Sequence, residues 1–139
     1  MNLARIAFLA PLAALALPGA PAHAKDDPGE AELARLLEGR VAGEPVRCLN
    51  GSRQGSVQIV DRTAMVFRDG ATLYVNRPDG ARILDWNDLP VFRLFGSSMC
   101  HRDQVELRDR STLFPGPVIL LGEFVPYRRA GDARPNEGG

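Results

Sequence analysis

The chain has 139 residues, of which 17 are basic and 17 acidic, so its formal charge is zero, and 45% of its residues are apolar. A chain of this length usually forms one domain. The charge balance argues against a protein that coats nucleic acid, and the composition argues against a collagen-like repeat or a long acidic tail. We therefore expect an ordinary globular domain that has no nucleic-acid partner.

The first 24 residues have the pattern of a secretory signal peptide. Arg5 is the only charged residue before an apolar run at residues 6–17, and an Ala-His-Ala tripeptide ends at Ala24. Small side chains at these positions are what signal peptidase recognises, so we expect cleavage between Ala24 and Lys25. The apolar run is too short for a membrane-spanning helix, which needs about 20 residues. The sequence predicts a periplasmic or secreted protein without a membrane anchor.

Cys48 and Cys100 are the only cysteines of the chain, and both follow the expected cleavage site. In an oxidising compartment we expect them to form a disulfide. Closing a loop of about 53 residues stabilises a protein by roughly 4 kcal/mol in the chain-entropy model. The alternatives are a free thiol at Cys100 or a metal site with His101 and Asp103. Only one histidine follows residue 24, which excludes a His-rich metal site, and we expect neither a metal nor a cofactor.

A helix is predicted directly after the cleavage site. Asp27 is a typical N-cap residue, and Pro28 suits the first helical position. Leucines then recur at helical spacing and form an apolar stripe of about three turns, which consists of Leu33, Leu36, Leu37 and, at its far end, Val41.

From Pro45 onward, the sequence changes to short segments that are rich in branched and aromatic residues and separated by turn signals. This pattern predicts β-strands. The clearest hairpin has Asp69 and Gly70 at its turn, because Asp-Gly suits a two-residue loop that requires a positive φ. Further turns are expected at residues 78–80 and 109–111, whereas residues 89–96 fit either a strand or a helical turn.

The predicted hairpin carries apolar side chains on both faces, with Val66 and Leu73 on one face and Phe67 and Tyr74 on the other. A sheet with one solvent-exposed face would not have this pattern. The sheet is therefore either curled into a small barrel or covered on its second face by the helix. We expect an α+β fold in which the N-terminal helix packs on a mostly antiparallel, strongly curled sheet or small barrel. The domain is expected to span residues 25–126, followed by a disordered tail at residues 127–139.

The chain contains none of the common catalytic motifs, such as HExxH, GxSxG, GxGxxG, a Walker loop or CxxC. The catalytic candidates are His101 as a general base and Asp103 as the residue that orients it. Alternatively, Asp103 is a turn residue that bonds backbone amides. A separate group of residues is the candidate binding surface, and it consists of Trp86, Phe92, Phe95 and Arg102.

Five short motifs follow one another in a distinctive order. They are Pro-Val-x-Cys ending at Cys48, Val-Asp-x-Thr ending at Thr63, Tyr-Val-Asn ending at Asn76, Met-Cys-x-x-Asp ending at Asp103 and Leu-Gly-x-Phe-x-Pro-Tyr ending at Tyr127. In this order the chain resembles, over residues 30–127, a family of small exported bacterial proteins whose function is not known. The resemblance implies a helix, a β-sheet and one or two disulfides. Family members often have further cysteines near positions 80–84 and 117–119, where this chain has none. The resemblance implies no activity.

Three functions are compatible with these features. We expect a non-enzymatic binding or structural module of the bacterial cell envelope, whose partner is an unknown envelope protein or a small ligand. This function predicts an exposed apolar or aromatic patch around Trp86, Phe92 and Phe95. The first alternative is a small periplasmic hydrolase or lyase that uses His101 and Asp103, which predicts a concave pocket around them. The second alternative is an inhibitor of an envelope enzyme that presents residues 89–99. The sequence does not indicate an oligomeric state.

Overall fold

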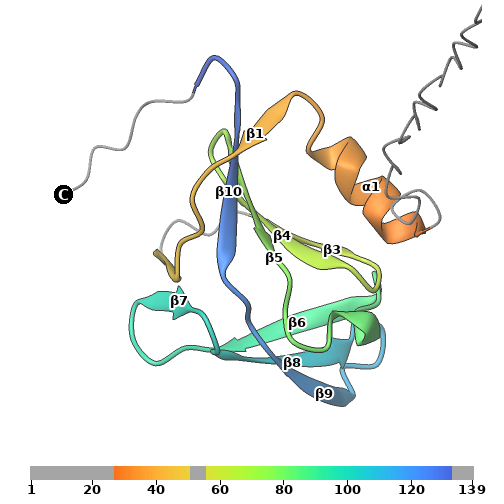
Figure 1. The fold of residues 1–139 in the computed structure, drawn as a ribbon. Coiled ribbons are helices and arrows are strands. Elements are labelled where there is room, and N and C mark those ends of the chain that lie inside the picture. The colour runs from red at the N-terminus through yellow and green to blue at the C-terminus, as the bar shows by residue number, and fades with distance from the viewer. Residues whose placement is uncertain (1–26, 51–55, 133–139) are drawn as a thin grey trace, which may run out of the picture.

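Antiparallel sheets and one α-helix build the part of the chain that the computed structural model describes, residues 27–50 and 56–132 (Figure 1). The predicted signal peptide at residues 1–24 and the end of the predicted tail, residues 133–139, lie outside the described residues. Within them, the strands form a five-stranded, a three-stranded and a two-stranded sheet.

Helix α1 spans Pro28–Leu36 and begins as predicted. The side chain of Asp27 accepts a hydrogen bond from the backbone N–H of Gly29 at 2.9 Å, and Pro28 occupies the first turn. The helix ends earlier than expected, because Gly39 adopts φ 71 and the chain then turns into strand β1, Arg40–Ala42. No helix among residues 27–50 and 56–132 is long and apolar enough to cross a membrane.

The five-stranded sheet contains the predicted hairpin at its centre. Its strand order is β1-β10-β5-β4-β3, where β3 is Val57–Val60, β4 is Ala64–Asp69, β5 is Thr72–Asn76 and β10 is Phe124–Arg129. Asp69 pairs with Thr72, so the loop of the hairpin is Gly70-Ala71, one residue later than predicted, and Gly70 has φ 56. Strand β10 continues to Arg129, which places the first residues of the predicted tail in the sheet.

The other two sheets come from the second half of the chain and from strand β2. The three-stranded sheet has the order β6-β8-β9, with β6 at Asp88–Arg93, β8 at Gln104–Asp109 and β9 at Pro115–Leu120. The ambiguous segment at residues 89–96 therefore starts as a strand. Strand β2, Cys48–Asn50, pairs with β7, Ser98–Cys100. A short 3-10 helix at Ala81–Ile83 leads from β5 toward β6.

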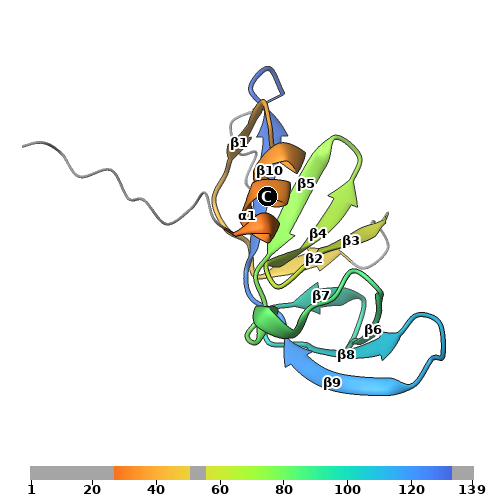
Figure 2. The same cartoon turned by 90° about the vertical axis from the view of Figure 1, so that its right-hand side faces the viewer.

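Two groups of buried residues cover the two faces of the five-stranded sheet. On one face, Leu33 of α1 packs with Val66 and Leu73, and Leu36 and Leu37 pack against them. The other face packs against the three-stranded sheet, which lies below it in both views (Figure 1 and Figure 2). This second core is the larger one, and its buried members include Met65, Phe67, Met99, Leu107 and Phe124.

The prediction of an α+β fold with a strongly curled sheet or small barrel is wrong. The described residues are mostly β-structure with one short α-helix, and no sheet among them is closed or strongly curled. The prediction that both faces of the hairpin are covered is confirmed. Because the three-stranded sheet covers the face that α1 leaves open, the five-stranded sheet does not need to curl to bury its apolar side chains.

Candidate functional site

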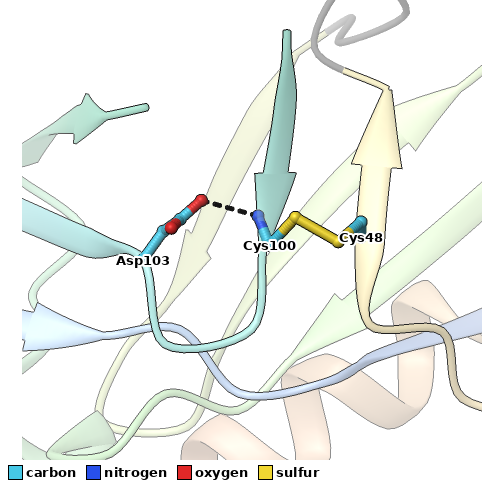
Figure 3. Close-up of a disulfide and its surroundings, with 3 residues drawn as sticks. All are labelled: Cys48, Cys100 and Asp103. Carbon is cyan, nitrogen blue, oxygen red and sulfur yellow. Dashed lines mark hydrogen bonds between the residues drawn. A yellow bond between two sulfur atoms is a disulfide. The ribbon is translucent and has the colours of Figure 1, made fainter. Parts of the chain in front are cut away.

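Cys48 and Cys100 form the predicted disulfide, which joins β2 to β7 (Figure 3). The two cysteines are direct partners in the antiparallel ladder, and their Cα atoms are 4.0 Å apart. Among the described residues, β2 and β7 form a sheet of their own. The disulfide therefore links two short strands that the larger sheets do not include, and it is consistent with an oxidising compartment.

The turn after β7 contains the predicted catalytic pair. The backbone N–H of Asp103 donates to the carbonyl oxygen of Cys100 at 3.0 Å, and the carboxylate of Asp103 accepts a hydrogen bond from the backbone N–H of Cys100 at 2.7 Å (Figure 3). Arg102, between His101 and Asp103, has φ 72. The carboxylate of Asp103 thus stabilises the turn, which is the structural alternative considered from the sequence.

His101 has no arrangement that resembles a catalytic base. Its backbone N–H donates to the carbonyl oxygen of Arg47 at 2.6 Å. Its buried ring atom Nδ1 has no hydrogen-bond partner among the described residues. His101 and Asp103 line neither the cleft beside the start of α1 nor the smaller cavity between β2 and the β4–β5 hairpin. The geometry therefore gives no support to the hydrolase or lyase hypothesis.

The four residues of the predicted binding surface do not lie together. Trp86 precedes β6 and is 68% exposed, whereas Phe95 follows β6 and is 89% exposed. A six-residue strand is about 20 Å long, so these two side chains lie at opposite ends of β6. Phe92 is half-buried and packs on Phe67, with ring centroids 5.9 Å apart. Arg102 lies in the turn after β7.

Trp86 lies in a loop that carboxylates hold in place. Asp61 accepts a hydrogen bond from the backbone N–H of Trp86 at 2.5 Å. Within the loop, Asp85 accepts from the backbone N–H of Asn87 at 2.8 Å, and Asp88 accepts from the backbone N–H of Asp85 at 2.9 Å. These bonds fix the backbone of the loop and leave the indole of Trp86 exposed.

A second loop, between β8 and β9, is held by Asp109. One oxygen of this carboxylate accepts hydrogen bonds from the backbone N–H of Ser111 at 2.9 Å and from the backbone N–H and hydroxyl of Thr112 at 2.7 and 2.9 Å. The bonds from Thr112, then that from Ser111, lower the pKa of Asp109. The loop exposes Leu113 and Phe114, whose side chains are 57% and 73% exposed. Leu113 has φ 59, a conformation that is unusual for a bulky residue.

Hydrogen bonds join the two loops to each other. The backbone N–H of Arg110 donates to the carbonyl oxygen of Asn87 at 3.0 Å, and its guanidinium donates to the carbonyl oxygen of Asp88 at 3.0 Å. The side-chain amide of Asn87 also donates to the carboxylate of Asp109 at 3.0 Å. Asp88 and Asp109 are direct partners in the pairing of β6 with β8. Both loops therefore lie at the same end of the three-stranded sheet, at the right in Figure 1.

We call Trp86, Leu113 and Phe114 together the Trp86–Phe114 surface. Of these three residues, only Trp86 belongs to the binding surface predicted from the sequence, and the other aromatic residues of that prediction, Phe92 and Phe95, lie elsewhere along β6 and the loop after it. A signal for Leu113 and Phe114 was present, because residues 111–122 contain no charged side chain although a turn precedes them. An uncharged run beside a turn does not show whether its side chains are buried, so the signal alone was not decisive.

Acidic side chains predominate around the Trp86–Phe114 surface. The two loops and the turn between β3 and β4 contain Asp61, Asp85, Asp88 and Asp109, against the basic residues Arg62 and Arg110. Burial raises the pKa of Asp88, and the negative charges of the other three aspartates raise it further, although a hydrogen bond with the backbone of Asp85 opposes this shift. In this set of residues the carboxylates therefore outnumber the guanidinium groups, four to two.

A cleft of about 620 Å³ lies between the start of α1, the turn after β3 and the segment before Trp86, and its lining residues are Asp27, Pro28, Gly29, Asp61, Arg62, Leu84 and Asp85. A smaller cavity of about 190 Å³ lies between β2 and the β4–β5 hairpin. Within the described parts of the chain, no three His, Cys, Asp or Glu side chains are grouped as they would be around a metal ion.

Comparisons with protein-family models, with curated proteins and with solved structures found no match to this chain. The resemblance to the family of small exported bacterial proteins therefore remains a prediction.

Proposed function

We propose that this chain is a non-enzymatic module of the bacterial cell envelope, which binds a partner through the Trp86–Phe114 surface after export and cleavage between Ala24 and Lys25. One observation carries the proposal. Two loops that are joined by hydrogen bonds and held by carboxylates keep three large apolar side chains in solvent. Exposed apolar side chains on adjoining loops are typical of protein interaction sites, where Trp and Phe are enriched.

The fixed backbone of the two loops supports a role in binding. Binding costs free energy when it orders loops and side chains at the interface, and loops whose backbone is already ordered avoid the first of these costs. The conformation of Leu113 also supports the role. A bulky residue with a positive φ lowers the stability of the fold, and such strained residues are concentrated at functional sites.

The disulfide supports the proposed location. A bond between Cys48 and Cys100 persists in the periplasm or outside the cell, and it would be reduced in most cytosols. The location therefore agrees with the leader pattern in the first 24 residues, and we propose that the protein is periplasmic or secreted.

A second candidate function is the inhibition of an envelope enzyme through the loop between β6 and β7. The observation that favours it is the exposure of Phe95, which is 89% exposed and precedes Gly96 at φ 114. An exposed aromatic side chain on a connecting loop is a suitable anchor for the cleft of an enzyme.

Photo-crosslinking distinguishes the two candidates. The photoreactive residue p-benzoylphenylalanine replaces either Phe114 or Phe95 in the full chain, expressed in the bacterium that produces it. We expect a crosslinked protein adduct from position 114 that disappears when Trp86→Ala is added, and no adduct from position 95. An adduct from position 95 alone supports the inhibitor function instead. The absence of adducts from both positions overturns both, and thermal unfolding confirms that each variant is folded.

A further inference from the structure

We propose that the partner of the Trp86–Phe114 surface presents an apolar surface bordered by lysine or arginine side chains. This inference rests on the proposed function and specifies the chemistry of the partner. The apolar part of the partner would cover Trp86, Leu113 and Phe114, and its basic border would face the aspartates that hold the two loops.

The aspartates are well placed to attract cations. In the hydrogen bonds that hold the loops, Asp61, Asp85 and Asp88 accept from neutral backbone N–H groups, so their negative charges are not compensated by these bonds. Asp109 also accepts from neutral donors, and its lowered pKa keeps it ionised well below neutral pH.

The basic side chains near the surface are too few to neutralise it. The two loops and the β3–β4 turn hold four aspartates and two arginines, Arg62 and Arg110, which leaves a formal charge of 2 − 4 = −2. Arg108 of β8 is paired with Glu106, at 2.8 Å. Counting Arg82 of the preceding 3-10 helix as well still leaves an excess of acidic groups.

The same charges argue against other occupants. In a symmetric dimer that uses this surface, each copy would place its aspartates against those of the other copy, and like charges across an interface cost several kcal/mol. Anionic lipids and nucleic acids carry negative charge and would also be repelled. A protein surface that has cations around an apolar centre satisfies both parts of the site.

Trp86 is the only tryptophan of the chain, so its fluorescence reports directly on this surface. The probes are two designed amphipathic helical peptides with the same pattern of leucines, one with lysine at every polar position and the other with glutamate. We expect the lysine peptide to shift the emission of Trp86 to shorter wavelength, because the indole becomes buried. The glutamate peptide should bind at least about tenfold more weakly, and added salt should weaken the binding of the lysine peptide.

A pair of matched variants tests whether the response comes from the proposed surface. The double variant Leu113→Ser/Phe114→Ser should bind the lysine peptide at least about tenfold more weakly than the wild type does. This loss corresponds to roughly 1.4 kcal/mol. The control variant Phe95→Ser, which removes an even more exposed aromatic side chain beyond the other end of β6, should bind like the wild type. Equal binding by the double variant overturns the inference, and circular dichroism verifies that both variants are folded.

The remaining outcomes separate this inference from the proposed function. Equal or tighter binding of the glutamate peptide, or no response to either peptide, overturns the inference that the partner has a basic border. The proposed function is decided separately, by crosslinking from position 114. An emission shift with phosphatidylglycerol vesicles identifies a membrane as the occupant. A shift that depends on protein concentration identifies a second copy of the chain. Either result overturns the inference.

Discussion

Leu113 adopts a backbone conformation that lowers the stability of the fold, and its apolar side chain is exposed to solvent. Its φ is 59, and its side chain is 57% exposed. The hydrogen bonds that Asp109 accepts from Ser111 and Thr112 hold the loop in this shape. A left-handed conformation costs a non-glycine residue about 1–2 kcal/mol. At this position, folding and the proposed binding therefore favour different residues.

Leu113→Gly tests that conflict. Glycine adopts a positive φ without steric cost, so we expect the variant to gain up to about 1 kcal/mol in the free energy of unfolding, measured with urea. The same variant should bind the lysine peptide more weakly, because the apolar side chain is removed. The control is Arg102→Gly, at φ 72, which should gain similar stability and keep wild-type binding. A less stable Leu113→Gly variant would show that the leucine contributes to the fold.

Strands β2 and β7 show how a small element depends on a covalent bond. Each strand has three residues, and together they form a two-stranded sheet. Isolated two-stranded sheets are marginally stable in water. The disulfide between Cys48 and Cys100 and the carboxylate of Asp103 both act at the end of this ladder, where they hold the strands and the following turn.

Removing the disulfide with Cys48→Ser/Cys100→Ser should lower the free energy of unfolding by about 4 kcal/mol, the chain-entropy estimate for this loop length. Urea denaturation of the variant and of the wild type with and without reductant measures the effect. Reduced wild type should match the variant. Asp103→Asn is the matched control, because it changes the turn and leaves the disulfide intact, and it should be less destabilising. Equal stability of the oxidised wild type and the double variant would contradict a stabilising role for the bond.

At the scale of the whole molecule, the five-stranded sheet joins two cores. Leu33 of α1 packs on one face, and Phe124 of β10 is fully buried on the other, 5.5 Å from Phe67 between ring centroids. Two groups of ion pairs accompany these cores: the partly exposed Glu30 of α1 pairs with Arg77 at 2.5 Å, and the buried Glu106 of β8 pairs with Arg93 and Arg108 at 2.8 Å.

These carboxylates make the stability of the fold depend on pH. Hydrogen bonds from Arg77 lower the pKa of Glu30, and those from Arg93 and Arg108 lower the pKa of Glu106. A lowered pKa stabilises the fold above the ordinary value of about 4, and this stability is lost as the pH falls through the lowered value. Asp88 has the opposite effect, because burial raises its pKa.

The pKa of Asp109 is lowered as well, so three carboxyl groups with a lowered pKa oppose one with a raised pKa. We therefore expect the thermal midpoint to change little between neutral pH and about pH 5 and to fall below about pH 4. Thermal unfolding monitored by circular dichroism at several pH values measures this dependence. Glu106→Gln should make the acid side of the profile less steep. A midpoint that rises on acidification would contradict the assignment of these groups.

Local sequence patterns and the cysteine count allowed several features to be predicted from the sequence. The N-cap at Asp27 and the hairpin at Gly70 depend on residues within a few positions of each other, and the disulfide follows from the presence of only two cysteines. The apolar pattern of the hairpin also showed that both faces of its sheet are covered. It did not show what covers the second face, so it led to the wrong prediction of a curled sheet.

Only the tertiary structure decided where the candidate site lies. The backbone of Trp86 is held by Asp61, which is 25 residues away, and Asn87 bonds Asp109 across 22 residues. Contacts between such distant residues depend on how the sheets pack, and no local pattern in the sequence specifies them. Whether Leu113 and Phe114 are exposed likewise depends on how the loop between β8 and β9 packs against the rest of the fold, because an apolar side chain gives the same sequence pattern in a core and at a binding surface.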